Sequence, residues 1–378
     1  SGPDPLDDLF RFTVGIFKGA TGRQLKSIEC HDLMCKIGSV VVVGGVRRSA
    51  LISLSDLQDQ EMALAKSGEW WNNEGQRALA NNSVCYKEKP PIGIFMREWL
   101  TLYNSKSGER GIYNRQSAVE KSLENGRRDS EHDFGTNPCS EIILRPYQFC
   151  NLTEVVVRAE DTIEDLERKI GLATILGTIQ STLTDLKYLR KIWKDNTEEE
   201  RLLGVSLTGI MDNALLNSAS AGYLSELLSQ LKDVAVYTNL GLSKQLGIPQ
   251  STAITCVKPS GTVSQLVDSA SGIHARHSEY YIRTVRGDKK DPLTQFMQSV
   301  GVPVEDDIMQ PDSTVVFSFP VKSPSKAVTR NDTGAIEQLN LWLKYQKNWC
   351  EHKPSVTITV KEDEWLDVGA WVYENFDD

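Results

Sequence analysis

The chain has 378 residues, of which 51 are acidic and 42 basic, so its formal net charge is −9. A hydrophobic content of 40% and a charged content of 25% are typical of a globular protein, and the length suits one large α/β domain or two ordinary ones. The acidic balance argues against a general nucleic-acid-binding protein, and no apolar run approaches the roughly 20 residues of a membrane helix.

Taken in chain order, the hydrophobic pattern predicts helices that alternate with short strands. The expected elements are a helix at 24–37, a strand at 39–43, a helix at 56–66, strands at 93–95, 111–113 and 153–158, one or two helices at 166–194, a strand at 202–207, a helix at 221–246, strands at 252–256 and 315–319, a helix at 336–349, a strand at 356–360 and a helix at 362–375. Gly247 is a helix stop signal. The alternation predicts an α/β fold with mainly parallel strand pairing, although periodicity does not distinguish an open sheet from a barrel.

The cysteines do not indicate a disulfide framework. There are seven, an odd number, and they are widely spaced at 30, 35, 85, 139, 150, 256 and 350. No secretory signal is visible, so a reducing cytoplasm is the expected setting. Cys30 and Cys35 fit neighbouring turns of one helix, and we interpret both as structural.

The segment 135–147, with the sequence GTNPCSEIILRPY, is the most informative part of the chain. It places Asn137, Cys139 and Glu141 at alternate positions, which point the same way if the segment is extended. An amide, a thiol and a carboxylate would then face one cavity. Such a set can hold hydroxyl groups, supply a reactive sulfur and move a proton, which suits a reaction on a polyol such as ribose.

The string from Asn137 to Arg158, NPCSEIILRPYQFCNLTEVVVR, resembles the finger loop of ribonucleotide reductases, and in particular of the adenosylcobalamin-dependent, monomer-type class II enzymes. Further strings resemble the same family in the same order: GGVRRSA at 44–50, ANNSV at 80–84, LGVSLTG at 203–209 and KPSGT at 258–262. The resemblance runs through nearly the whole chain. It implies a ten-stranded α/β barrel with the 135–152 segment threading its centre.

The resemblance implies a role for each side chain of this segment. Cys139 would become a thiyl radical that removes the 3′ hydrogen of the ribose, Glu141 would take the proton of the 3′ hydroxyl, and Asn137 would hold the sugar hydroxyls. Cys150 would be one of two cysteines that reduce the 2′ position and form a disulfide. Its partner lies on the first barrel strand in the family, and no cysteine of this chain can be matched to it.

The same resemblance implies that residues 1–378 are a catalytic-core fragment, without the upstream first strand and effector region and without the downstream cysteine-bearing tail. The expected reaction is the reduction of a ribonucleoside di- or triphosphate, with adenosylcobalamin as cofactor. A nucleotide effector and a thioredoxin-like external reductant would act on the complete enzyme, and no nucleic-acid or membrane partner is expected.

Two turns that follow predicted strands are candidate nucleotide contacts. Residues Pro259, Ser260, Gly261 and Thr262 form a short turn with hydroxyls at the start of a helix, which can present N–H groups to an anion; the family binds substrate phosphates there. We expect Gly261 to approach the ligand closely or to need a positive φ. Gly45, Arg47 and Arg48 lie in the turn matching the family's specificity loop, which carries the effector signal to the substrate base.

Several alternatives remain open at this stage. His274 and His277 have a spacing that suits one helix face, but no further metal ligands are evident, and no metal site is expected. The chain could instead be a class I-like large subunit fed by a separate metal-containing radical subunit, or a catalytically silent nucleotide-binding fragment that needs a partner polypeptide. A cysteine-nucleophile hydrolase would need a histidine near Cys139, and only His132 is close in sequence.

Overall fold

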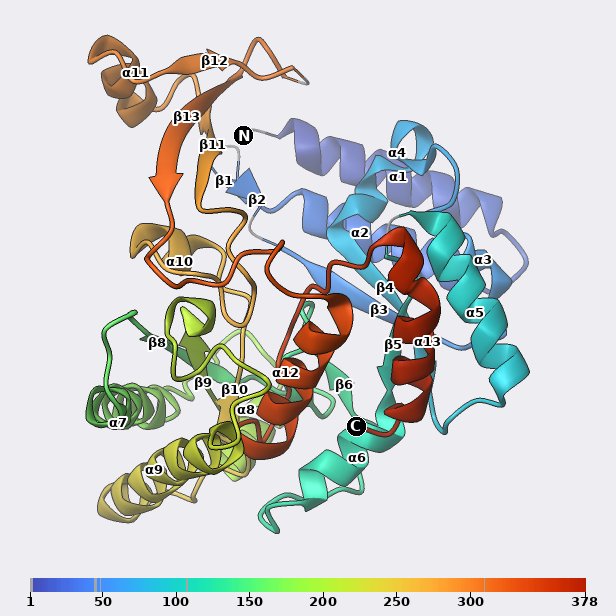
Figure 1. Ribbon diagram of the computed structural model, residues 1–378. Coiled ribbons are helices and arrows are strands. Elements are labelled where there is room, and N and C mark those ends of the chain that lie inside the picture. The colour runs from blue at the N-terminus through green and yellow to red at the C-terminus, as the bar shows by residue number, and fades with distance from the viewer. Residues whose placement is uncertain (1–2, 44–45, 48, 107, 309) are drawn as a thin grey trace. The chain divides into compact units, whose positions relative to one another are not determined.

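The computed structural model describes residues 3–43, 46–47, 49–106, 108–308 and 310–378. The chain folds into two compact units. Unit 1 consists of Ser1–Val84, Asn104–Ile112 and Tyr280–Lys322, and unit 2 consists of Cys85–Tyr103, Tyr113–Glu279 and Ser323–Asp378. Each unit is therefore assembled from segments that are far apart in the sequence, and each is described separately below (Figure 1).

Unit 1 combines short helices with two kinds of strand pairing. Its helices are α1 (Asp4–Gly19), α2 (Ser27–Ser39), α3 (Gln60–Ala63), α4 (Trp70–Asn73), the 3-10 helix η1 (Gly75–Leu79) and α11 (Pro292–Ser299). Strand β3 (Leu51–Ser55) runs parallel to β4 (Ala80–Tyr86), while β1 (Val42–Val43) and β2 (Val46–Arg47) form an antiparallel pair. Strands β11 (Tyr280–Asp288), β13 (Thr314–Lys322) and β12 (Val304–Asp306) form an antiparallel sheet in that order.

A buried charged cluster ties α2 to η1 and β4 within unit 1. Arg77 donates two hydrogen bonds of 2.7 Å each to the carboxylate of Asp32. The neighbouring ring of His31 lies 3.0 Å from Asn82 Oδ1 and 3.5 Å from Asp32 Oδ1. Cys35 is fully buried against the same ring, at 3.8 Å, which agrees with a structural role.

Unit 2 is built around a parallel sheet in the order β10-β9-β8, with β8 at Asn151–Val156, β9 at Leu203–Thr208 and β10 at Thr255–Cys256. Its remaining elements are α5 (Ile92–Ser105), α6 (Arg115–Leu123), β6 (Gly135–Thr136), β7 (Ile143–Leu144), α7 (Ile163–Gln180), α8 (Lys191–Glu200), η2 (Ile210–Asp212), α9 (Leu224–Leu246), α10 (Thr262–Leu266), α12 (Ala335–Asn348), η3 (Glu362–Glu364) and α13 (Trp365–Glu374), with β5 (Gly111–Asn114) at a unit boundary.

The main core of unit 2 lies between this sheet and helices α7, α9 and α12. Every residue of β9 is buried, because the strand pairs on both edges and is covered on both faces. Gly209, which ends the strand, has a φ of +86°, and a Cβ there would lie 2.4 Å from the carbonyl oxygen of Val157. Only glycine fits this close approach, so the sequence ends β9 with a glycine for a local steric reason.

The helix predictions in the second half of the chain are confirmed. The pattern at 166–194 is two helices, α7 and α8, and α9 ends at Gly247 with the expected left-handed conformation, φ +67°. Three predicted elements are much shorter than expected: the strand at 39–43 is only Val42–Val43, because α2 continues to Ser39, the helix at 56–66 is only Gln60–Ala63, and the strand at 252–256 is only Thr255–Cys256. Two further predicted strands are wrong. Residues 93–95 belong to α5, which follows Pro90 and Pro91, and 356–360 is irregular backbone.

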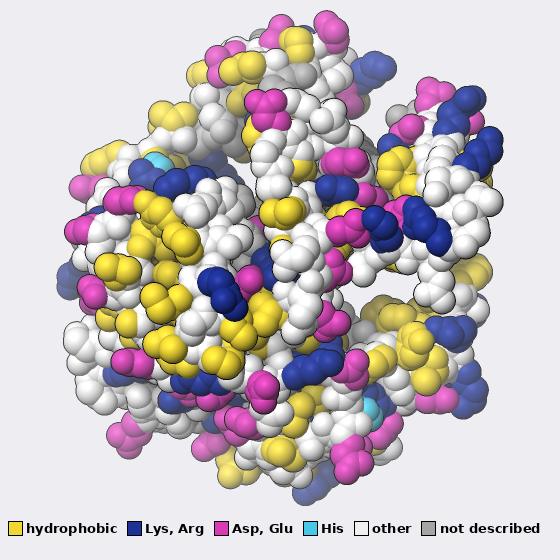
Figure 2. Space-filling model, turned by 90° about the vertical axis from the view of Figure 1, so that its right-hand side faces the viewer, with side chains coloured by type: hydrophobic (Ala, Val, Ile, Leu, Met, Phe, Trp, Pro, Cys, Tyr) yellow, Lys and Arg dark blue, Asp and Glu magenta, His cyan; other side chains and the backbone are white. Residues whose placement is uncertain are grey.

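The α/β class is confirmed. The strand pairing is mixed: the pairs β3–β4, β8–β9 and β9–β10 are parallel, whereas the pairs β1–β2, β6–β7, β11–β13 and β12–β13 are antiparallel. In the described residues the sheets have two or three strands each and are not closed, so the ten-stranded barrel stays a prediction. Among these residues no helix combines the length and the apolarity that crossing a membrane would require. Side chains of both charge signs are interspersed on the face seen in Figure 2.

Candidate active site

The predicted finger loop of unit 2 is a hairpin with a tight turn at its tip. Strands β6 and β7 pair antiparallel, with Gly135 opposite Leu144. Between them, the N–H of Ser140 donates to the carbonyl of Asn137 over 2.9 Å, which closes a four-residue turn. Asparagine at the first position and Pro138 at the second are favoured in such turns, because proline presets φ and asparagine bonds nearby backbone.

This turn contradicts the expectation that Asn137, Cys139 and Glu141 alternate along an extended segment. Cys139 is exposed at the tip, whereas Glu141 has only 1% of its surface exposed. The side-chain oxygen of Asn137 accepts a hydrogen bond of 2.9 Å from the N–H of Ile142, so it braces the turn. The prediction from spacing was wrong because the proline and the asparagine fold the segment back on itself; the roles of the three residues stay predictions.

Cys150 lies just before β8 and is electrostatically linked to Glu141. Burial raises the pKa of the Cys150 thiol well above its usual range, the Glu141 carboxylate raises it further, and the Arg128 guanidinium opposes both. Glu141 is buried and Cys150 is half-buried, and the two lie within electrostatic reach of each other although they are nine positions apart in the sequence. The structure brings together these two members of the predicted catalytic set.

A third cysteine, which the sequence did not single out, lies in the same region. Cys256 on β10 is fully buried, and burial, Cys150 and Cys350 all raise the pKa of its thiol. A Cβ on Gly204 would lie 2.4 Å from a methyl of Leu152 and 3.3 Å from the Cys256 sulfur. The absent side chain of Gly204 therefore leaves room for Leu152 and Cys256 beside β9. No local sequence signal distinguishes Cys256 from a core cysteine.

A buried network around Arg128 holds the second half of the hairpin. The Arg128 Nη2 donates to the carbonyl of Ile143 at 3.0 Å, to Gln148 Oε1 at 3.2 Å and to Glu200 Oε2 at 3.0 Å. Arg145 donates a 2.7 Å hydrogen bond to Glu199, which lies beside Glu200 on α8. Because Arg128 and Glu200 are paired while buried, the network fixes the path of the chain between Cys139 and Cys150, and the Arg145–Glu199 pair adds to it at the surface. Sequence reasoning missed Arg128, because the charged segment around it is typical of a surface loop.

His352 joins the hairpin to the central sheet. Its Nδ1 accepts a hydrogen bond of 3.3 Å from the N–H of Ile143, and its Nε2 lies 2.9 Å from the carbonyl of Leu203, to which it donates. This pattern needs the neutral ring, and burial, with Arg128 nearby, lowers the pKa of His352 to about 3. His132, the histidine nearest to Cys139 in sequence, directs its Nε2 to Arg145 at 3.1 Å.

In the predicted phosphate turn, polar groups of Ser260 are already engaged in hydrogen bonds with Ser264. The hydroxyl of Ser260 accepts from the N–H of Ser264 at 2.9 Å, and Ser260 is 4% exposed, whereas Gly261 and Thr262 are exposed. Pro259 is half-buried. Gly261 has φ −82°, and a Cβ there would meet no atom within 4 Å. The expectation of a positive φ was wrong, because the residue has right-handed helical geometry where any side chain is allowed; the alternative, a close approach to a ligand, stays a prediction.

The predicted specificity loop is described only in part. Arg47 is the last residue of β2 in unit 1, and Gly45 and Arg48 lie outside the described residues. The histidines at 274 and 277 do not form part of a metal-binding group: in the described residues no three His, Cys, Asp or Glu side chains are arranged to hold an ion. His274 instead contacts the carbonyl of Ser271 at 2.9 Å and Thr357 Oγ1 at 3.2 Å.

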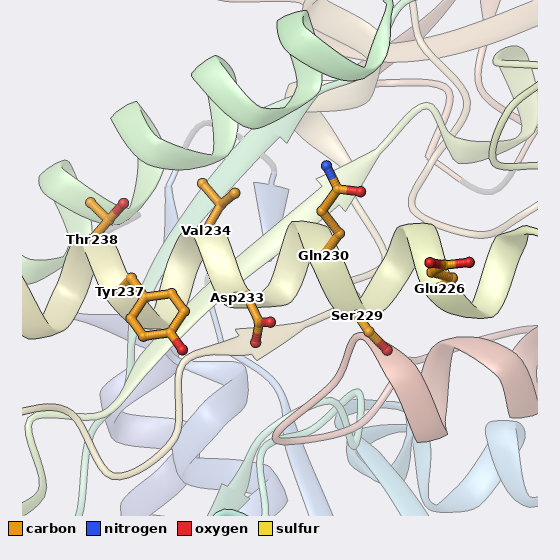
Figure 3. Close-up of a pocket in the computed structure, with 7 residues that line it drawn as sticks. All are labelled: Glu226, Ser229, Gln230, Asp233, Val234, Tyr237 and Thr238. Atoms are coloured by element: carbon orange, nitrogen blue, oxygen red, sulfur yellow. The ribbon is translucent and has the colours of Figure 1, made fainter.

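Two surface hollows of unit 2 lie apart from the predicted residues. One, of about 640 Å³, follows α9 and is lined by Glu226, Ser229, Gln230, Asp233, Val234, Tyr237 and Thr238 (Figure 3). In this view Val234, Gln230 and Thr238 point toward α7. The Gln230 Nε2 donates a hydrogen bond of 2.7 Å to Glu167 Oε1 on α7. The second, of about 750 Å³, is an apolar groove between α5 and α13, which contains Trp99, Trp365 and the exposed Leu366.

The fold is similar to that of solved ribonucleotide reductases. A solved structure of a B12-dependent class II ribonucleotide reductase superposes with a TM-score of 0.77 at 24% identity, covering 99% of this chain and 55% of that one. The alpha subunit of a class Id ribonucleotide reductase from Actinobacillus ureae gives a TM-score of 0.62 at 14% identity, covering 93% of this chain and 74% of that one.

Sequence comparison shows which class of ribonucleotide reductase the chain is similar to. Adenosylcobalamin-dependent ribonucleoside-triphosphate reductases from Euglena gracilis and Levilactobacillus brevis are 29% and 28% identical to the chain, over 95% and 97% of its length. The chain spans about half the length of these relatives, 48% and 52%. No protein-family model matches it. The resemblance is nevertheless confirmed: the chain is similar to adenosylcobalamin-dependent ribonucleoside-triphosphate reductases over nearly its whole length.

Proposed function

We propose that the complete protein reduces ribonucleotides to 2′-deoxyribonucleotides by a thiyl-radical mechanism, with residues 1–378 as its catalytic core. The observation that carries the proposal is that the chain matches adenosylcobalamin-dependent reductases over nearly its whole length. In the matching loop Cys139 is exposed and Glu141 is buried. In the complete protein we expect the strands of this core to belong to a ten-stranded barrel around the hairpin.

The proposed chemistry assigns one task to each residue of the hairpin. The sulfur of Cys139, as a thiyl radical, removes the 3′ hydrogen, and Glu141 takes the proton of the 3′ hydroxyl. Asn137 holds the sugar hydroxyls through its amide N–H₂, because its oxygen is already engaged by Ile142. The 2′ hydroxyl then leaves as water, and two thiols, Cys150 and one from outside this chain, supply two electrons and two hydrogens and become a disulfide. Cys139 finally returns its hydrogen to the 3′ carbon, which regenerates the thiyl radical.

Adenosylcobalamin fits the exposed position of Cys139. A large cofactor can come next to this sulfur because it lies at the tip of the hairpin and is open to solvent. Homolysis of the carbon–cobalt bond of the bound cofactor would supply the radical chemistry, and the protein residues position the sulfur and the sugar. The matched relatives favour this cofactor over a separate metal-containing radical subunit, and they favour an enzyme over a silent nucleotide-binding fragment.

The substrate and partners follow from the same proposal. The turn of Pro259, Ser260, Gly261 and Thr262 would bind the substrate phosphates through the exposed N–H groups at Gly261 and Thr262. Gly45, Arg47 and Arg48 would carry the signal of a nucleotide effector. A thioredoxin-like reductant in a reducing cytoplasm would restore the dithiol. The relatives are named for triphosphate reduction, so a ribonucleoside triphosphate is the first substrate to test.

The test uses the complete protein with adenosylcobalamin, a ribonucleoside triphosphate and a small dithiol. The parent should form the deoxynucleotide over many turnovers. Cys150→Ser should still start the reaction at the 3′ carbon but lack an electron donor, so we expect release of the free base and little product. Cys30→Ser, at an exposed cysteine of α2, is the control and should match the parent. Normal product formation by Cys150→Ser over many cycles would contradict the proposed dithiol.

A further inference from the structure

The segment that follows α12, residues 351–355, lies along the end of β10 in unit 2. The N–H of His352 donates to the carbonyl of Thr255 over 3.0 Å, and the N–H of Val257 donates to the carbonyl of Lys353 over 3.2 Å. Donors therefore alternate between the two segments, as they do between paired strands. Backbone hydrogen bonds thus fix segment 351–355 to the central sheet.

Two consecutive arginines hold this segment and the hairpin. Arg127 Nη2 lies 2.6 Å from both carboxylate oxygens of Glu351, whose side chain is buried. The next residue, Arg128, donates to the carbonyl of Ile143 in the hairpin over 3.0 Å. Because neighbouring residues carry the two guanidinium groups, they restrict movement of the segment relative to the hairpin.

The segment also contacts the hairpin directly, through two consecutive residues. The N–H of Lys353 donates to the carbonyl of Glu141 over 3.1 Å. The N–H of Ile143 donates to Nδ1 of His352 over 3.3 Å, and His352 is fully buried. Both contacts lie just after the Cys139 turn, so they set the position of this turn and of the predicted proton acceptor, Glu141.

The imidazole ring of His352 reaches the central sheet with its other nitrogen. Its Nε2 donates to the carbonyl of Leu203 over 2.9 Å. Leu203 on β9 is the register partner of Asn151 on β8, and Asn151 directly follows Cys150. One side chain therefore connects the hairpin that carries Cys139 to the strand pair that begins beside Cys150.

We propose that His352 is a positioning residue that holds the hairpin on the central sheet, so that Cys139 and Cys150 act on the same sugar. The inference rests on the proposed function, which assigns hydrogen abstraction to one cysteine and reduction to the other. A misplacement of about 1 Å can cost about a hundred-fold in rate, so both sulfurs need a fixed place. None of the strings that resemble the reductase family includes residues 351–355. A histidine that only stabilised the fold would leave the hairpin in place in a variant that still folds.

The first measurement locates the hairpin without catalysis. Nitroxide labels are attached to Cys139 and to the cysteine of Leu176→Cys, at an exposed position of α7, in a Cys30→Ser background. Pulsed electron paramagnetic resonance gives the distribution of distances between the labels. His352→Phe keeps a ring but loses both hydrogen bonds, so this distribution should broaden or move. His352→Gln should restore the parent distribution, because its amide offers the same acceptor and donor.

The matched control removes a different buried hydrogen bond of unit 2. The hydroxyl of Tyr345 donates to the carbonyl of Leu216 over 3.0 Å, and neither residue belongs to the hairpin. Tyr345→Phe should lower the free energy of unfolding but leave the distances unchanged. A parent distribution in His352→Phe, or an equal broadening in Tyr345→Phe, would overturn the inference whether or not the protein is active. If His352→Phe does not fold, His352→Asn repeats the measurement, because the shorter amide cannot reach both Ile143 and Leu203.

Activity of the complete protein supplies the second readout. His352→Phe should lower kcat about ten- to a hundred-fold with KM for the ribonucleotide nearly unchanged, and more turnovers should end in release of the free base. His352→Gln should recover most of this loss. A parent kcat in His352→Phe despite a displaced hairpin would contradict the positioning role. If the distances change as expected but the parent itself makes no deoxynucleotide, the proposed function fails, while the attachment of the hairpin by His352 is confirmed.

Discussion

Replacing Arg128 by methionine should weaken the whole of unit 2. The residue is 5% exposed, and its Nη2 alone donates to Glu200, Gln148 and the carbonyl of Ile143. Methionine keeps much of the volume and the contact with the ring of Phe134, 4.8 Å from the guanidinium carbon, but leaves the Glu200 carboxylate buried with a weaker set of partners. Breaking a buried ion pair on one side costs about 3–5 kcal/mol, so we expect a loss of that size in the free energy of unfolding.

The assay is urea unfolding of the chain followed by circular dichroism. Arg168→Met, which removes an exposed ion pair with Asp165 on α7, is the control and should leave the curve nearly unchanged. The double variant Arg128→Met/Glu200→Met removes both charges, so it should be clearly less destabilised than Arg128→Met alone. A single variant as stable as the control, or a double variant that loses more than the single one, would refute the account of the network.

Three further predictions concern other parts of the chain. Gly209→Ala should destabilise unit 2 by about 1–3 kcal/mol in the same unfolding assay, because its φ is +86° and a Cβ would lie 2.4 Å from the Val157 carbonyl oxygen. The pKa of His31 is raised to about 9: burial opposes this shift, and the hydrogen bond to Asp32 favours it. The resulting stability should be complete below pH 6.5 and be lost as the pH rises through 9, and His31→Gln should remove that pH dependence. Gly261→Val should fold like the parent, since its Cβ meets open space, and should weaken nucleotide binding measured by calorimetry about ten- to a hundred-fold; equal affinity would mean that the phosphates bind elsewhere.

The sequence predicted well those elements whose signals are local. Helix α9 combines a long amphipathic pattern with a glycine stop, and both features act within the element itself. Strand β9, with the sequence LGVSLT, is buried along its whole length and is followed by Gly209, as expected for a central parallel strand. These elements need no information from distant parts of the chain, so pattern reading identifies them.

The elements that were missed depend on partners elsewhere in the chain. Residues 356–360, VTITV, have a strong strand pattern but form irregular backbone, because β propensity is realised only where a neighbouring strand is available. Conversely, β11 pairs along nine residues with β13, a partner that lies well downstream and cannot be identified from local sequence. At 93–95 three apolar positions were too few to distinguish a strand from the first turn of α5.

The residues of the candidate site divide in the same way, into those with a recognisable local sequence and those that depend on contacts made by the fold. The hairpin residues were predicted because their strings resemble a known family, whereas the geometric argument from alternate positions failed at the turn closed by Asn137 and Ser140. His352 was missed because it reaches the hairpin from a distant segment through a hydrogen bond, and Arg128 was missed because the charged segment around it is typical of a surface loop. A single sequence contains no signal for such tertiary contacts.

The most direct test of the proposed reaction is the yield of deoxynucleotide from Cys139→Ser in the complete protein, supplied with adenosylcobalamin, a ribonucleoside triphosphate and a dithiol. An O–H bond is stronger than an S–H bond, so serine cannot readily form the radical that removes the 3′ hydrogen. The account predicts no product above background, with nucleotide binding by calorimetry unchanged and Cys30→Ser fully active. Sustained turnover by Cys139→Ser would contradict the central claim that this sulfur carries the radical.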